Sequence, residues 1–197
     1  MPAEMMRAER SRAAILRAAF ELYQEQSYNK VTIEGIAARA GVGKPTVYRR
    51  WPSKGAVVLD AVIEAVPPAP FPDTGDIERD LRSWLYGIVD LLADPKRGPL
   101  FAGLVGAAQH DHELAAAWRE RLYRPTRREN VERLCKAKAD GQLPDLDPDL
   151  IIDLLAGPVW FRLLVVGERP TRQLADKALR LVIGASARSA KSEKRAL

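Results

Sequence analysis

The chain has 197 residues, of which 47% are hydrophobic and 29% are charged, and its formal net charge is +5. This size is enough for one small and one medium helical unit and excludes several large domains, and the apolar content predicts a folded core rather than disorder. Cys135 is the only cysteine, so an intrachain disulfide is excluded. No apolar run is long enough for a secretory signal or a membrane span, so we expect no membrane partner and a cytoplasmic location.

The excess positive charge is concentrated at the amino-terminal end. Residues 1–55 contain ten basic and five acidic side chains, whereas the rest of the chain contains 21 of each. A local excess of cations attracts phosphate groups, so the distribution favours a nucleic-acid partner for this segment. An ordinary basic surface is the alternative.

Helical periodicity runs through almost the whole sequence, which predicts an all-α fold. The apolar spacing indicates a first helix over about residues 7–26. Thr32 is a typical N-cap for a second helix, Gly41 suits its end, and a third helix starts near Lys44 and Pro45. Two short helices joined by a tight glycine turn are typical of a helix-turn-helix, which places its second helix in the DNA major groove.

The segments that follow are also predicted to be helical. Ser53 caps a connecting helix over residues 53–66, and the proline-rich residues 67–72 mark a domain boundary. The later predictions, in chain order, are a helix capped by Asp76, a loop bracketed by Asp94-Pro95 and Gly98-Pro99, a short apolar helix at 100–108, a helix at 111–140 kinked or split by Pro125, a helix at 150–166 opened by Asp147-Pro148, and a last helix capped by Thr171.

The segment 150–166 is apolar on nearly all sides. One packed face would leave much of this surface in water, so we expect it to be buried against its own domain and a second copy of the chain. A central core helix of a single subunit is the alternative.

A series of short motifs follows the first helix and the glycine turn. They are Ile15-Leu16-Arg17-Ala18-Ala19, Thr32, Ile36-Ala37, Ala40-Gly41-Val42, Tyr48, Trp51 and Ser53-Lys54. In this order and register they resemble the tetracycline-repressor (TetR/AcrR) family of transcriptional regulators, over about residues 10–60, and the carboxy-terminal part is similar more loosely. Ser27 replaces the usual glycine after the first helix, Gly43 replaces the usual Ser/Thr cap, and Trp51 replaces the common Phe.

The resemblance implies a DNA-binding domain of three helices and a carboxy-terminal helical bundle for ligand binding and dimerisation. It implies a ligand-responsive repressor that binds a palindromic double-stranded operator as a homodimer through its last two helices. An activator of the same fold, or a helical small-molecule or protein-binding module without DNA activity, is the alternative. The expected boundaries are 1–55 for the DNA-binding domain, 53–66 for the connecting helix, 67–190 for the regulatory and dimerisation domain and 191–197 for a mobile tail.

Residues at the helix-turn-helix are expected to contact DNA. The third helix presents donors to groove edges and phosphates, and Tyr48 resembles the family tyrosine that donates its hydroxyl to a phosphate. Alternatively, Tyr48 is an aromatic at the edge of the core and the arginines are solvated. The expected DNA-binding residues are Thr32, Lys44, Pro45, Thr46, Tyr48, Arg49, Arg50 and Lys54.

An effector pocket is expected among aromatic and aliphatic side chains of the carboxy-terminal region, although these side chains also fit a plain core. The expected pocket residues are Trp84, Ile88, Phe101, Leu104, Trp118, Trp160 and Phe161. His110 and His112 point apart on a helix and have no evident third ligand, so we expect no metal. Phosphate-binding glycine loops and Cys/His nucleophile pairs are also missing, so we expect no cofactor, no catalytic residues and no enzyme.

Overall fold

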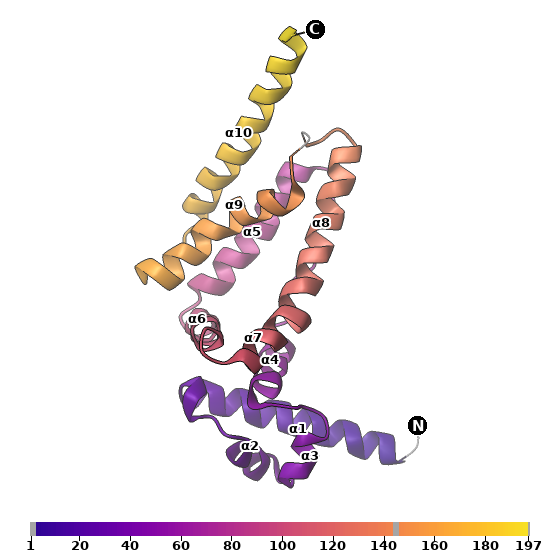
Figure 1. Cartoon of the computed structure of the whole chain (residues 1–197), viewed down its shortest axis with the longest axis vertical. Helices are drawn as coiled ribbons and strands as arrows, with labels where there is room; N and C mark the ends of the chain where they lie inside the picture. The colour runs from indigo at the N-terminus through magenta and orange to yellow at the C-terminus, as the bar shows by residue number, and fades with distance from the viewer. Residues whose placement is uncertain (1–2, 144–145, 197) are drawn as a thin grey trace. The chain divides into compact units, whose positions relative to one another are not determined.

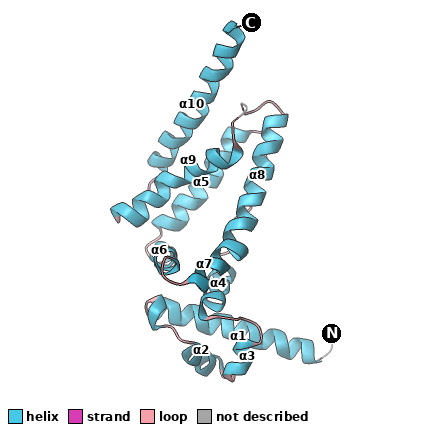
Figure 2. Cartoon of the chain, viewed as in Figure 1, coloured by secondary structure: helices cyan, strands magenta, loops and turns pink. Residues whose placement is uncertain are grey.

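The computed structural model describes the backbone of residues 3–143 and 146–196, and the side chains of residues 5–143 and 146–184. These residues form helices joined by turns, with no strand among them, which confirms the all-α prediction (Figure 2). The chain divides into two compact units. The first comprises Met1–Pro68 and Leu100–Pro125, and the second comprises Ala69–Pro99 and Thr126–Leu197.

The first unit begins with helices that pack around one apolar core. Long α1 packs against α2 and α4, and Ile15, Ala19 and Ile36 are fully buried between them. The elements are α1 (Ala3–Glu25), the single 3-10 turn η1 (Tyr28–Lys30), α2 (Ile33–Ala40), α3 (Lys44–Tyr48) and α4 (Lys54–Ala65), as Figure 1 shows.

Local caps explain where these helices start and stop. The Thr32 hydroxyl accepts a hydrogen bond from the Gly35 amide at 3.0 Å, and Gly41 ends α2 with a left-handed φ of 66°. Ser53 caps α4 in the same way as Thr32 caps α2. Ser27 adopts an extended conformation, so the missing glycine after α1 causes no backbone strain.

The first unit also receives a later part of the chain. The segment contains most of α6 (Arg97–Ala108), α7 (His112–Trp118) and the π-helical turn η2 (Arg119–Tyr123). The single helix predicted at 111–140 is therefore interrupted before Pro125, which has no amide hydrogen and disturbs the preceding turn. The loop predicted to end at Gly98-Pro99 is shorter, because both residues lie in the first turn of α6.

The second unit contains the remaining helices. Helix α10 packs against α5 and α9. Asp76 and Asp147 act as the predicted N-caps, of α5 and α9 respectively. The elements are α5 (Ile77–Ala93), α8 (Arg124–Ala139), α9 (Pro148–Phe161), the π-helical turn η3 (Arg162–Val166) and α10 (Arg172–Ala196).

The predicted domains follow the order of the chain, whereas these compact units do not. Residues 100–125 contact the amino-terminal helices, which a division in chain order could not express. Helix α10 continues to Ala196 through most of the tail predicted at 191–197, and Leu197 lies outside the described residues. The mobility of this tail stays a prediction.

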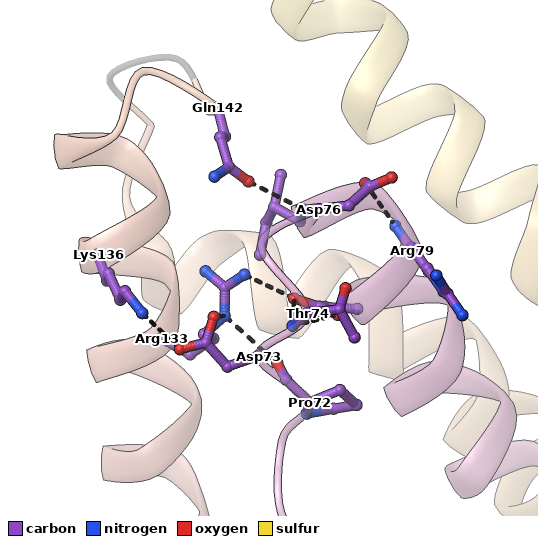
Figure 3. Close-up of polar contacts among 10 residues, drawn as sticks. Pro72, Asp73, Thr74, Asp76, Arg79, Arg133, Lys136 and Gln142 are labelled. Carbon is purple, nitrogen blue, oxygen red and sulfur yellow. Dashed lines mark hydrogen bonds and ion pairs between the residues drawn. The ribbon is translucent and has the colours of Figure 1, made fainter.

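A buried polar cluster fastens the segment after the prolines to α8 (Figure 3). Arg133 donates to the fully buried Asp80 at 2.6 Å and lies 3.2 Å from the carboxylate of Asp73. Burial raises the pKa of Asp80, but hydrogen bonds from Thr74 and Arg133 outweigh it and hold the pKa below its usual value. The cluster therefore positions the start of α5 against α8. Across the described residues, no helix is long and apolar enough to cross a lipid bilayer.

Candidate nucleic-acid interface

The segment 44–50 has one buried and one exposed side, as its sequence predicts. Val47 is completely buried and Trp51, just beyond the segment, is 2% exposed, so both anchor α3 to the core. Tyr48 is 53% exposed. Lys44, Pro45, Arg49 and Arg50 are also exposed, and Thr46 is half-buried. The Tyr48 hydroxyl is therefore accessible to a partner, and its role in DNA binding stays a prediction.

Lys44 lies at the start of α3 and is paired with α2. Its ammonium is 2.6 Å from the carboxylate of Glu34, and the hydrogen bond holds the pKa of Glu34 below its usual value. Both side chains are exposed, and a pair in water contributes little stability. A phosphate can therefore replace Glu34 as the partner of Lys44 at low cost.

Arg50 has a structural contact that the sequence did not indicate. One of its terminal nitrogens donates to the backbone carbonyl of Ala8 in α1 at 2.9 Å. The guanidinium has five donors, so this bond leaves others available. Arg49, the C-cap of α3, is exposed and follows the helix directly. The two neighbouring arginines thus have different surroundings.

Thr32 and Lys54 both make bonds within the protein in addition to any contact with DNA. The oxygen of the Thr32 hydroxyl accepts the capping bond, which leaves its hydrogen free to donate. Lys54 is half-buried, donates to the carbonyl of Tyr28 at 3.3 Å and lies 4.2 Å from the centre of the Tyr28 ring. Lys54 therefore also holds α4 to the turn after α1.

Asp60 is a residue of this region that the sequence analysis missed. One of its carboxylate oxygens accepts from the indole nitrogen of Trp51 at 2.7 Å and from Arg121 at 2.6 Å. The carboxylate thus joins the end of the helix-turn-helix to α4 and η2. The sequence signal for Asp60 was an acidic residue directly after the apolar run Ala56–Leu59. Its partner Arg121 is 61 positions away, and no local pattern pairs it with Trp51.

Tyr28 and Asp111 form a second connection to the later segment. The Tyr28 hydroxyl donates to the carboxylate of Asp111 at 2.6 Å, and the same carboxylate caps α7. Burial, reinforced by this carboxylate, raises the pKa of Tyr28. Burial also raises the pKa of Asp111. The hydrogen bonds from Tyr28 and from the capping amides lower this pKa by more, so it lies below its usual value. The neutral phenol and the ionised carboxylate are therefore the stable pair.

The expected pocket residues fall into both compact units. In the first, Phe101 and Trp118 form an edge-to-face pair with ring centres 6.4 Å apart, and Leu104 is fully buried. In the second, Trp84 stacks on Phe71 with ring centres 5.4 Å apart, whereas Phe161 is exposed. Ile88 and Trp160 of this unit are half-buried. Grouping of the seven residues around one ligand stays a prediction.

Metal-ligating side chains do not gather at this site. Over the described part of the chain, no group of three or more His, Cys, Asp or Glu residues is placed to hold a metal ion.

A glycine turn followed by a short helix with a buried apolar side and an exposed basic side defines a helix-turn-helix DNA-binding protein. Residues 15–61 match the family described as bacterial regulatory proteins, tetR family, and residues 71–182 match the tetracyclin repressor-like C-terminal domain. The chain belongs to the TetR family and is a DNA-binding transcriptional regulator.

Several named proteins are similar to this chain over most of its length. The uncharacterized HTH-type transcriptional regulator YdeS of Bacillus subtilis is 36% identical over 82% of this chain and 82% of its own. The DNA-binding transcriptional repressor TetR of Mycobacteroides abscessus is 29% identical over 92% of this chain and 98% of its own. The crystal structure of the TetR family regulator SCO0332 superimposes with a TM-score of 0.74, at 36% identity over 88% of this chain and 97% of its own.

Proposed function

We propose that this regulator is a ligand-responsive repressor that binds a palindromic operator as a homodimer. The observation that carries the proposal is the exposed basic face of residues 44–50, held over buried Val47 and Trp51. Such a face presents donors to base edges and phosphates while its other side fixes the helix in place. We propose that the protein acts in the cytoplasm, by binding alone and without catalysis.

The DNA contacts divide into reading and positioning groups. Thr46 and Arg49 face the groove edges, while Pro45 offers an apolar surface to a thymine methyl. Lys44 and the Tyr48 hydroxyl bind phosphates, and Thr32 donates its hydroxyl hydrogen to the backbone at the start of α2. Arg50 and Lys54 combine a DNA contact with their bonds to Ala8 and Tyr28.

The homodimer is supported by exposed apolar side chains on the last elements of the second unit. Water-facing aliphatic and aromatic groups in this number are typical of a surface that is covered in the assembly. They are Leu150, Leu154, Phe161, Leu164, Val165, Val166 and Leu181. Two copies joined there would present two reading helices to half-sites about 34 Å, or a multiple of that distance, apart.

The effector is proposed to bind the carboxy-terminal region and to change the spacing of the two reading helices. The aromatic pair Phe71–Trp84 of the second unit and, separately, the pair Phe101–Trp118 of the first unit each supply a flat apolar surface of the kind that binds small organic molecules. A typical coupling of about 1–3 kcal/mol between effector and operator is expected. Repression, rather than activation, is supported by the name of the Mycobacteroides relative.

DNA selection from a random duplex pool tests the proposal directly. The purified full-length protein should enrich an inverted repeat, and binding of the enriched duplex should weaken steeply with salt, because phosphate contacts release counterions. Analytical ultracentrifugation of the complex should give two subunits per duplex. Failure to enrich any sequence, together with salt-independent binding, would instead support a helical binding module without DNA activity.

A further inference from the structure

The first turns of α1 lie outside the segment that matches the family's DNA-binding domain. That match begins at Ile15, whereas α1 begins at Ala3. Twelve additional helical residues correspond to about 18 Å of helix at 1.5 Å per residue. We name this amino-terminal extension, residues 3–14, the leading arm. Figure 1 shows α1 as one continuous helix that leads to the amino terminus.

Two contacts hold the leading arm in place. Arg50, at the end of the proposed reading segment, donates to the carbonyl of Ala8 at 2.9 Å. On the other side, Arg12 forms an ion pair with Glu64 of α4 at 2.8 Å. These bonds fix residues 8–12 against the helix-turn-helix, so the arm is continuous with the proposed DNA surface and needs little ordering on binding.

The leading arm carries arginines that form no ion pair with the described side chains. Arg7 and Arg10 are exposed and, three residues apart, lie on neighbouring positions of one helix face. Arg12 is occupied by Glu64 and by Glu9 at 3.5 Å. Among the described side chains, neither Arg7 nor Arg10 has an acidic partner within 4.0 Å. The Nε of Arg10 donates to the carbonyl of Met6 in the same helix at 3.3 Å, which leaves its terminal nitrogens available. Two such guanidinium groups on an arm that is bonded to Arg50 complement the phosphates that flank the groove.

We propose that the leading arm is a second DNA contact, in which Arg7 and Arg10 bind backbone phosphates next to the groove occupied by α3. Arg50 is the positioning residue that holds the arm beside the reading helix. The arm contributes affinity for any sequence and no base recognition, because it reaches phosphates only. This proposal rests on the proposed DNA-binding function and adds a contact outside residues 32–54.

The test compares full-length wild-type protein with the double variant Arg7→Ala/Arg10→Ala on two duplexes, one selected by the wild-type protein and one scrambled. Fluorescence anisotropy across a salt series gives the slope of log K against log salt. Each lost phosphate contact reduces that slope by about 0.9, so we expect a reduction of about 1.8 for each bound subunit. Affinity should fall roughly tenfold or more on both duplexes, which leaves their ratio unchanged.

The matched control is Arg79→Ala/Arg128→Ala, which removes the same charge from two exposed arginines of the second compact unit, outside the proposed dimer surface. We expect this variant to keep the wild-type slope. An unchanged slope in the arm variant, or an equal loss in the control, would overturn the arm contact while leaving the proposed DNA binding intact. Wild-type protein without salt-dependent DNA binding would overturn both.

The role of Arg50 is tested by repeating the arm substitutions in an Arg50→Ala background. If Arg50 positions the arm, removing Arg7 and Arg10 should cost much less there than in the wild-type background, because the arm is already displaced. Fully additive losses would mean that Arg50 acts only through its own DNA contact and would overturn its positioning role.

Discussion

At the scale of the single residue, Tyr48 is the sharpest probe of the DNA surface. The Tyr48 side chain is about half exposed although its neighbour Val47 is completely buried. Among the described residues, its hydroxyl has no hydrogen-bond partner. We expect Tyr48→Phe to weaken operator binding about tenfold, because a hydrogen bond to a charged phosphate is worth about 1.5 kcal/mol. Anisotropy titration with the selected duplex at fixed salt measures this change.

Stability supplies the control for Tyr48→Phe. The substitution removes one exposed oxygen and should leave the urea midpoint of unfolding unchanged, because surface changes of this kind stay within about 0.5 kcal/mol. Wild-type affinity in the variant would place DNA away from the Tyr48 hydroxyl, and the assignment of residues 44–50 would need revision.

Sequence reasoning located the exposed residues of the site but not their partners. The helical period alone separates Val47 from Tyr48, so burial follows from local spacing. The contact of Arg50 with Ala8 and that of Lys54 with Tyr28 connect residues 42 and 26 positions apart. Such pairs depend on how α1 packs on the later helices, and no local pattern encodes that packing.

At the scale of helices, the packing around Gly55 is another long-range contact that local sequence patterns do not predict. A Cβ added at Gly55 would lie 2.8 Å from the Cα and Cβ atoms of Leu114, so α4 and α7 approach each other too closely for a side chain. The helix ends themselves were predictable, because caps such as Thr32 and Asp76 act within three residues. The close packing of α7 on α4 was not, since it places residues 59 positions apart in contact.

We expect Gly55→Ala to destabilise the protein by about 1–3 kcal/mol, because α4 and α7 must separate to admit the methyl group. Urea unfolding followed by circular dichroism measures the loss. Gly87→Ala in α5 is the matched control: no atom lies within 4 Å of the added Cβ, and alanine should stabilise that helix by about 0.5–1 kcal/mol. If both variants gave the same sign, the α4–α7 contact would not be tight.

At the scale of the whole molecule, each compact unit contains a carboxylate with a lowered pKa. Asp111 lies in the first and Asp80 in the second, and hydrogen bonds outweigh the opposing effect of burial in both. The pKa of each carboxylate is lower in the folded protein than its unfolded value of about 3.9. The ionised carboxylate therefore stabilises the fold fully at pH values above about 3.9. The contribution is lost as the pH falls through the lower, folded value.

We therefore expect the free energy of unfolding to decline from about pH 4 downward, and Asp80→Asn to flatten that decline. The same variant should lose about 3 kcal/mol at neutral pH, because Arg133 keeps its buried charge without the carboxylate. Urea titrations at several pH values measure both effects. Asp90→Asn, which breaks an exposed pair with Arg172, should change stability by less than about 0.5 kcal/mol. A steep wild-type decline already at pH 6 would contradict this assignment.

The assembly is tested at Leu181, which is 70% exposed on α10. A charge within the proposed apolar interface would be buried without a partner, so Leu181→Glu should convert the proposed homodimer to monomers in sedimentation experiments. Operator affinity should fall by orders of magnitude, since each half-site is then bound separately. Ser83→Glu, which adds the same charge at an exposed polar position of α5, should preserve the dimer. A dimeric Leu181→Glu variant with full operator affinity would move the interface away from this part of α10.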